Sequence, residues 1–297
     1  MSKCSRHHCQ YNYHASAYGF AAEIDRPVQQ SLHAQAASAL SGSGGRGSNR
    51  VESFSLPPFI SFDAAYSEVG GSFDDCHNVH TTYTTSVIEG LNIADVVTAD
   101  RIVCRMAIYS PKVKDGTCEP TDPNAEHEFD ITGSHFDNLR IAGHEIELEL
   151  ATQKLQNHAT FSKFEGAFTN IGAEDLLLWG KQTGPRLDQL EKAEQQYHPL
   201  TGMGQRAKRW AKKKEKHDGY RCSPAGHLDI PGQLKGSGLD GFGSIILIPK
   251  FGVVRLAEMT VEPHRRYLTM INVQMASPGS GGGSGPGNGG GTNPTFP

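Results

Sequence analysis

The feature that most constrains the fold of this chain is a two-residue hydrophobic period, which recurs in several short segments. In HEIELELA (144–151), Ile146, Leu148 and Leu150 alternate with glutamates, and in RIVCRMAIY (101–109) every second residue from Ile102 is apolar. Successive side chains of a β-strand point to opposite faces, so each segment would have one buried and one solvated face. The sequence therefore predicts a protein built mainly from half-buried strands.

Other segments have the composition of strands and are separated by turn residues. HTTYTTSVI (80–88) is rich in β-branched and aromatic residues, and IILIP (245–249) and the residues 267–275 are largely apolar. Gly and Asp residues typical of turns lie between these segments, as at Gly70-Gly71 and Asp115-Gly116. We expect an all-β domain over residues 51–276, either a mainly antiparallel sandwich or a partly closed barrel.

Two segments share one order of residues, EGLNIADVVTADRIV (89–103) and DNLRIAGHEIELEL (137–150). In both, an acidic residue and a Gly or Asn precede a Leu-x-Ile step, whose apolar side chains would lie on one face of a strand. The acid and the Gly or Asn suit a tight turn or bulge with left-handed backbone. A looser third copy begins at Val253. We interpret the copies as structural corners of a sheet and not as a catalytic set, with a β-solenoid as the alternative fold.

The strings EGLNIADVVTADRIV and FDNLRIAG (136–143) resemble strings in uncharacterised bacterial β-rich proteins. The resemblance covers about the middle third of the chain. It carries over no activity, cofactor or functional residue.

Low-complexity segments bracket the expected domain. SGSGGRGSNR (41–50) and SPGSGGGSGPGNGGGTNPTFP (277–297) consist mostly of Gly and small polar residues. Such segments have little to bury and lose much backbone entropy when they order. We expect residues 1–50 to form an N-terminal extension that ends in a flexible linker, and residues 277–297 to form a disordered tail.

Between residues 182 and 218 the hydrophobic period becomes helical. Leu187, Leu190, Ala193 and Tyr197 recur at helical spacing, and Pro199 ends that run, so we predict an inserted α-helical hairpin. The second helix would carry a basic face made of Arg206, Lys208, Arg209, Lys212, Lys213, Lys214 and Lys216. This face suits an acidic partner protein, an anionic membrane surface or a nucleic-acid backbone, although a merely solvated face has the same composition.

The segment DDCHNVH (74–80) holds the first candidates for metal ligands, Cys76, His77 and His80. Zinc sites are built from Cys and His side chains, but this spacing matches no familiar zinc motif. Asp, Asn and His are also common in turns between strands. One hypothesis is therefore a metal-dependent enzyme that uses His77 and His80 with Asp74 or Cys76, and the other is a plain turn. No cofactor is expected, and a metal ion at these residues stays open.

Composition narrows the class of function. The chain has 28 basic and 32 acidic residues, a balance that argues against a protein whose whole surface coats nucleic acid. No apolar run is long enough for a secretory signal or a membrane span, and the six cysteines of so long a chain are best read as reduced thiols. We therefore expect a cytoplasmic protein.

No nucleophile elbow or phosphate-binding loop occurs in the sequence. We favour a non-enzymatic structural or binding protein, which would bind a protein partner or assemble with further copies of itself. Docking on an anionic surface through residues 206–216 and metal-dependent catalysis at His77 and His80 are the alternatives.

Overall fold

Antiparallel strands form most of the structure. The computed structural model describes residues 11–24, 30–112, 126–170, 177–179, 220–225, 236–242, 244–263, 265–275 and 281–292. Every strand pair registered among these residues is antiparallel. The all-β prediction is confirmed. The solenoid alternative is wrong, because a solenoid would pair its repeats in parallel.

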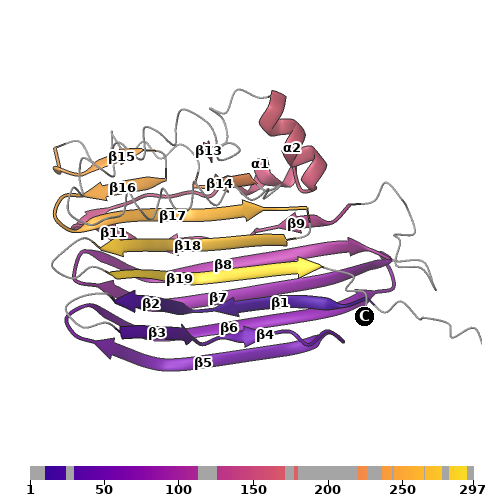
Figure 1. Ribbon diagram of the computed structural model, residues 1–297, viewed down its shortest axis with the longest axis horizontal. Helices are drawn as coiled ribbons and strands as arrows, with labels where there is room; N and C mark the ends of the chain where they lie inside the picture. Colours follow the sequence, from indigo (N-terminus) through magenta and orange to yellow (C-terminus); the bar gives the residue numbers. More distant parts are fainter. Residues whose placement is uncertain are drawn as a thin grey trace, which may run out of the picture.

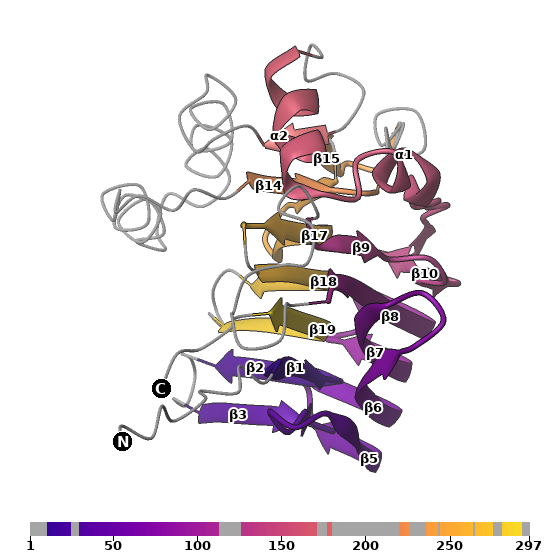
Figure 2. The same cartoon turned by 90° about the vertical axis from the view of Figure 1, so that its right-hand side faces the viewer.

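The strands form two sheets that face each other as the layers of a sandwich (Figures 1 and 2). Sheet B contains β5 (Gly45–Leu56), β6 (Ile60–Asp74), β7 (Val79–Ile93), β8 (Val97–Pro111), β9 (Glu128–Asp130), β10 (His135–Asp137), β11 (Arg140–Ile141) and β12 (His144–Glu145). Sheet A contains β1 (Tyr13–Tyr18), β2 (Phe20–Ile24), β3 (Gln30–Gln35), β4 (Ser38–Ala39), β13 (Leu177–Trp179), β14 (Tyr220–Ser223), β15 (Asp240–Phe242), β16 (Ile245–Ile248), β17 (Gly252–Val261), β18 (Arg265–Met275) and β19 (Gly281–Thr292).

Sequence neighbours pair in sheet B, whereas sheet A joins the two ends of the chain. In sheet B, β5, β6, β7 and β8 lie side by side, and β9, β10 and β11 share the other edge of β8. Sheet A runs in the order β13-β14-β17-β18-β19-β1-β4, so the last strand, β19, lies between β18 and the N-terminal strands (Figure 1). β2 also pairs with β19, and β3 pairs with β2.

The core fills the space between the sheets. On β8, Ile102, Cys104, Met106 and Ile108 are all buried, as their two-residue period predicts. The thiol of Cys104 donates a hydrogen bond across the sandwich to the carbonyl oxygen of Leu268, at 3.6 Å. Where β19 and β1 lie against β7, many buried residues of β7 and β1 are small, among them Thr82, Thr84, Ser86, Ala15 and Ala17. Small side chains on β7 suit a glycine-rich strand in the facing sheet, because the two strands can then pack closely without a cavity between them.

The repeated segments are hairpin corners, as their sequence predicts. Gly90 and Asn138, the Gly or Asn of the two copies, both have left-handed backbone, with φ of 63° and 49°. The Leu-x-Ile residues that follow are buried in both copies. Each copy then turns through two residues of positive φ, Ala94-Asp95 and Ala142-Gly143, as in a type I′ hairpin. The amide of Ala142 donates to the carbonyl oxygen of Val96, so the two turns lie side by side.

Each left-handed residue also changes which positions face the core. On β7 the inward positions are even up to Ile88 and odd from Leu91 onward. On β17 the same change occurs at Ala257, which has φ of 50° and belongs to the looser third copy. A left-handed residue therefore shifts by one position which side chains of the strand face the core. A simple two-residue period does not predict this shift.

Three expectations for the ends of the chain differ from the structure. The N-terminal extension contributes β1 to β4, and Phe20 of β2 is fully buried in the shared core. The expected linker at 41–50 makes a turn and then begins β5, where Gly45 pairs with Gly71. The tail expected to be disordered forms β19. Composition favoured disorder because these segments bury few side chains, but backbone pairing on neighbouring strands does not need side chains.

The described helices follow the strands of sheet B in the sequence, and the sequence did not predict them. They are α1 (Thr152–Gln156) and α2 (Phe161–Asn170), which bury Leu155 and Phe164. The predicted strand over HEIELELA is paired only at β12, although Ile146 and Leu150 are buried as expected. The predicted hairpin at 182–218 lies outside the described residues. Among the described residues, no helix is long and apolar enough to cross a membrane.

Candidate functional site

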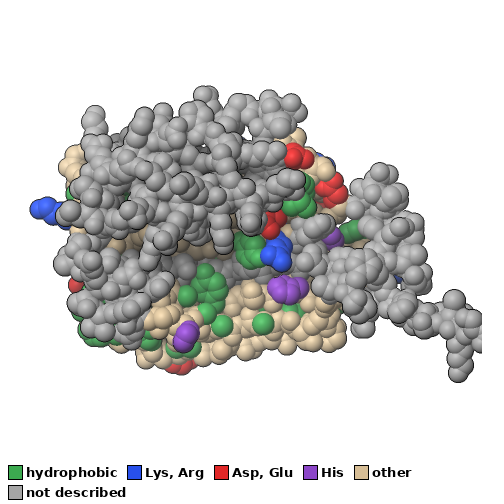
Figure 3. Space-filling model, in the orientation of Figure 1, with side chains coloured by type: hydrophobic (Ala, Val, Ile, Leu, Met, Phe, Trp, Pro, Cys, Tyr) green, Lys and Arg blue, Asp and Glu red, His purple; other side chains and the backbone are tan. Residues whose placement is uncertain are grey.

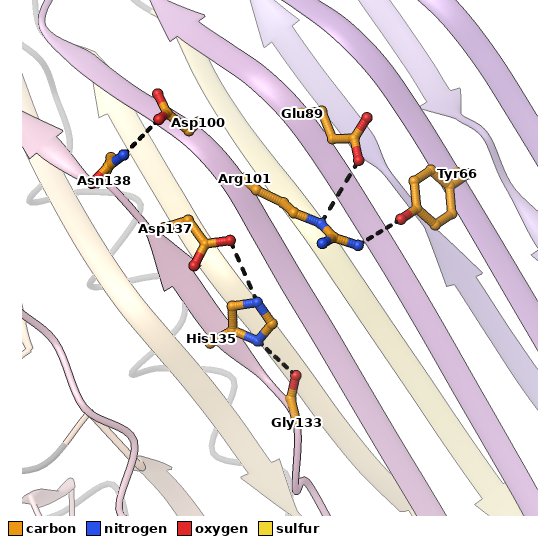
Figure 4. A network of polar contacts seen from close by, with 8 residues as sticks. All are labelled: Tyr66, Glu89, Asp100, Arg101, Gly133, His135, Asp137 and Asn138. Atoms are coloured by element: carbon orange, nitrogen blue, oxygen red, sulfur yellow. Dashed lines mark hydrogen bonds and ion pairs between the residues drawn. The ribbon is translucent and has the colours of Figure 1, made fainter.

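A polar network covers the outer face of sheet B around Arg101 of β8 (Figure 4). The cross-strand neighbours of Arg101 are Glu89 on β7 and Asp137 on β10, the acidic residues that open the two repeated segments. The Nε atom of Arg101 lies 3.7 Å from Oε1 of Glu89, and its Nη2 donates to the hydroxyl oxygen of Tyr66 at 2.9 Å. The side chains of Arg101 and Glu89 are 44% and 38% exposed, so this ion pair is open to solvent.

The second copy of the repeat extends the same network (Figure 4). Asn138 donates to Oδ2 of Asp100 at 2.6 Å, and Nε2 of His135 lies 3.5 Å from Oδ2 of Asp137. The acids of both copies thus meet at Arg101, on an open sheet surface. This arrangement fits the prediction that the repeats build the sheet, and it adds a charged surface that the sequence analysis missed.

Three tyrosines, Tyr66, Tyr83 and Tyr109, lie on the same outer face. They are on β6, β7 and β8, each between neighbours that face the core. The ring of Tyr83 lies over Gly70, where a Cβ atom would fall 2.3 Å from two ring carbons. Glycine at position 70 therefore lets this ring lie against the sheet. Tyr109 is 37% exposed, one of two large apolar or aromatic side chains exposed to this degree among the described residues.

Polar groups hold Tyr83 and Tyr66 in place. The hydroxyl of Tyr83 donates to Oε1 of Glu68 at 3.0 Å, and the guanidinium of Arg50 lies 5.4 Å from the centre of the Tyr66 ring. Burial raises the pKa of Tyr83, with a further contribution from Glu68, and burial together with Asp130 raises the pKa of Tyr109. Both hydroxyls therefore keep their protons at neutral pH and can donate as well as accept hydrogen bonds.

Figure 3 looks onto the outer face of sheet A, where the described surface left uncovered shows backbone and polar side chains with scattered apolar side chains and histidines. Tyr267 of β18 is 41% exposed and lies beside the glycine-rich β19, paired with Gly289.

The structure separates the predicted metal ligands. The carboxylate of Asp74 accepts hydrogen bonds from the backbone amides of Cys76 and His77, and it lies 2.8 Å from Nδ1 of His77. These contacts form an exposed turn after β6. These bonds lower the pKa of Asp74, the His77 side chain having the largest effect. His80 lies on β7, opposite Phe73. In the described part of the chain, no three His, Cys, Asp or Glu side chains are grouped as metal ligands would be. The turn interpretation fits this geometry.

His80 packs in an aromatic cluster instead. Its ring stacks on Tyr11 at 3.8 Å between centres and lies 4.8 Å from the ring of Phe73. The hydroxyl of Tyr13 lies 2.9 Å from Nδ1 of His80. Burial lowers the pKa of His80 below its usual value, and the nearby charge of Lys112 lowers it further. The fold therefore favours the neutral imidazole.

The lowered pKa predicts a loss of stability in mild acid. Unfolded His80 would titrate near pH 6.5. Because the folded pKa lies lower, the contribution of His80 is complete above pH 6.5 and is lost as the pH falls through the folded pKa. Thermal unfolding between pH 7.5 and pH 5 should show a smaller acid-induced decrease of Tm in His80→Phe, which keeps a stacking ring, than in the wild type. The same substitution at the exposed His144 is the control, and equal decreases in all three proteins would contradict the assignment.

The basic face predicted for Arg206, Lys208, Arg209, Lys212, Lys213, Lys214 and Lys216 lies outside the described residues, so docking through it stays a prediction. The described cysteines, Cys76, Cys104 and Cys222, are free thiols, as expected. Burial raises the pKa of the Cys222 thiol, so it stays protonated.

A buried arginine was missed by the sequence analysis. Arg266 of β18 is 3% exposed and lies 5.5 Å and 5.9 Å from the ring centres of Phe129 and Phe161. Burial lowers its pKa to about 10, against the opposing effects of Glu126 and Glu262, so it stays charged at neutral pH. The sequence could have predicted that Arg266 is buried, because it lies two residues before Leu268 and four before Met270, both of which face the core.

Comparison with known proteins adds a family and no activity. Residues 11–262 match the family model described as Domain of unknown function (DUF8256). The match includes the N-terminal strands together with sheet B and most of sheet A. No curated protein and no solved structure matches the chain.

Proposed function

We propose, from the premise that this chain belongs to the DUF8256 family, a domain family of unknown function, that it is a non-enzymatic binding protein. Its recognition surface would be the outer face of sheet B, and its ligand a neutral oligosaccharide. The observation that carries the proposal is the pair of tyrosines Tyr83 and Tyr109, which lie among hydrogen-bonding side chains on this face.

The two tyrosines occupy neighbouring positions on the outer face of adjacent strands, and the ring of Tyr83 extends over Gly70 of β6. Tyr83 pairs directly with Ala107, so Tyr109 is its diagonal neighbour on β8. Diagonal neighbours of an antiparallel pair lie about 7–8 Å apart. Gly70 and Ala107 beside them add no bulk above the sheet. A sugar ring is similar in size to the ring of a tyrosine. The C–H groups on its face are attracted by the negative face of an aromatic ring.

The polar surroundings favour a neutral ligand. Arg46 and Arg105 bring positive charge to the strand positions around the tyrosines, while Glu68, Glu128 and Asp130 bring negative charge. Charges of both signs can accept from and donate to hydroxyl groups. A nucleic acid or an anionic lipid surface would instead need a clear excess of positive charge.

Replacing Tyr109 with Ala should weaken binding to a soluble polysaccharide. Loss of one stacked ring removes about 0.5–1.5 kcal/mol, which corresponds to a roughly 2- to 13-fold lower affinity. Affinity electrophoresis through gels containing galactomannan, xylan or a mixed-linkage β-glucan would rank the polymers, and calorimetry with oligosaccharides of the best one would give the affinity. Tyr83→Phe should cause a smaller loss, because it removes only the hydroxyl that bonds Glu68.

Tyr267→Ala is the matched control, since Tyr267 is equally exposed but lies on sheet A. It should leave the affinity unchanged. Binding should also depend little on salt, because a neutral ligand displaces few counterions. If the wild type is not retarded by any of the polymers, or if Tyr267→Ala weakens binding as much as Tyr109→Ala, the proposal fails.

A further inference from the structure

The strand β19 has an unusual combination of position and anchoring. It is the last described strand of the chain, yet it lies inside sheet A, paired with β18 along one side and with β1 and β2 along the other. Removal of β19 would open a slot with an unpaired strand on each side.

Backbone hydrogen bonds provide nearly all the anchoring that β19 can have. Eight residues of GGGSGPGNGGGT are glycines, so the strand has few side chains to bury in the core. Withdrawal of the strand therefore breaks two ladders but removes little apolar surface from the core.

A second copy of the chain presents the same slot to the same tail. The pairing is antiparallel on both sides and is specified by the backbone alone, so a tail from another molecule would make every bond that the molecule's own tail makes. β18 ends at Met275 and β19 begins at Gly281, and the connection between them includes Pro278. A short connection to the exchanged element favours exchange between copies.

We propose that β19 is an exchangeable strand, and that the tail of one copy inserts between β18 and the strands β1 and β2 of a second copy. Reciprocal exchange closes a dimer, whereas donation in one direction extends an open chain of molecules. The bond between copies is then addition of a strand to a sheet, the mode by which extended peptides complete incomplete sheets. The partner of this surface is the protein itself.

Two variants, each with one added cysteine, test the exchange. Asn272 pairs with Ser284 across the β18–β19 ladder. Asn272→Cys and Ser284→Cys would be made separately in a chain whose Cys4, Cys9, Cys76 and Cys118 are replaced by Ser. Direct neighbours of antiparallel strands lie about 4.5–5.5 Å apart, a spacing that a disulfide can bridge. After mixing and oxidation, we expect a disulfide-linked heterodimer whose yield rises with protein concentration.

Two further variants make the result decisive. Gly291→Cys is the out-of-register control, because Gly291 pairs with Arg265 and not with Asn272. It should give at least tenfold less heterodimer than Ser284→Cys. In the double variant Asn272→Cys/Ser284→Cys, an intrachain disulfide would report the described register. If that disulfide forms but the mixed single variants never cross-link, or if both tail positions cross-link equally, the exchange is refuted.

Discussion

Truncation of the chain after Met275 should abolish cooperative folding or reduce the free energy of unfolding to near zero. The deletion removes β19, which joins β18 to β1 and β2, so sheet A would be cut between its N-terminal and C-terminal strands. A backbone hydrogen bond contributes about 0.5–1.5 kcal/mol net, so two ladders exceed about 5 kcal/mol and approach the total stability of a typical domain. Calorimetry and near-ultraviolet circular dichroism would measure the loss.

The control is a shorter truncation after Thr292, which removes five residues beyond β19 and should leave Tm unchanged. A chain ending at Met275 that unfolds with the wild-type Tm and enthalpy would show that β19 does not hold the sheet together. The synthetic peptide 277–297 should restore a cooperative transition to the truncated chain if the slot accepts a tail supplied by another molecule.

Gly252→Ala should destabilise the protein strongly, although it adds only a single methyl group. Gly252 begins β17 between β16 and β18, with φ of 152°. A Cβ atom at this position would lie 2.0 Å from the carbonyl oxygen of Gln274 and 2.9 Å from the Cα atom of Met275. These are backbone atoms of a paired strand, which cannot rotate away as the end of a side chain can. We expect the free energy of unfolding to fall by more than about 3 kcal/mol, at the upper end of strain effects at single residues.

Gly143→Ala separates this clash from the cost of backbone conformation alone. Gly143 has φ of 82° in the type I′ turn, but nothing lies within 4 Å of its potential Cβ atom. A left-handed L-residue costs about 1–2 kcal/mol. Urea unfolding of both variants gives the comparison, and a Gly252→Ala protein no less stable than Gly143→Ala would contradict the close approach of β17 and β18.

Local patterns in the sequence predicted much of sheet B. The alternation from Ile102 to Ile108 identified β8 and its buried face, and the Gly or Asn before each Leu-x-Ile step predicted the left-handed residues Gly90 and Asn138. The turn at Asp74 was also predictable, because its carboxylate bonds only to backbone amides and a side chain within three residues. These features depend on neighbours along the chain, so a short window of sequence contains their causes.

Composition gave a misleading prediction for the glycine-rich tail. Segments poor in apolar side chains cannot order themselves, and this reasoning is sound for an isolated chain. β19 orders against β18 and β1, whose unpaired amide and carbonyl groups need partners whatever the side chains are. Nothing in residues 281–292 encodes that need, because it belongs to other strands, of which β1 and β2 lie at the opposite end of the sequence.

The candidate surface was predicted in its parts and missed as a whole. Glu89 and Asp137 were identified as members of a repeated corner, but Arg101 between them was not singled out. Tyr83 and Tyr109 occur in recognised strands, and their common face follows only from the register of β7 against β8. Their grouping needed the pairing of strands, which the sequence did not specify.

By itself, the sequence determined where half-buried strands occur, where the left-handed residues lie and where the chain turns back, because period, glycine and turn chemistry act over a few residues. Only the tertiary structure decided that the two ends of the chain share sheet A, that β19 is central, and that Arg101 meets the acids of both repeats. The physical reason is that backbone hydrogen bonding between strands is nearly independent of side-chain identity. Partner and register are therefore set by how the whole core closes, and not by the segments that pair.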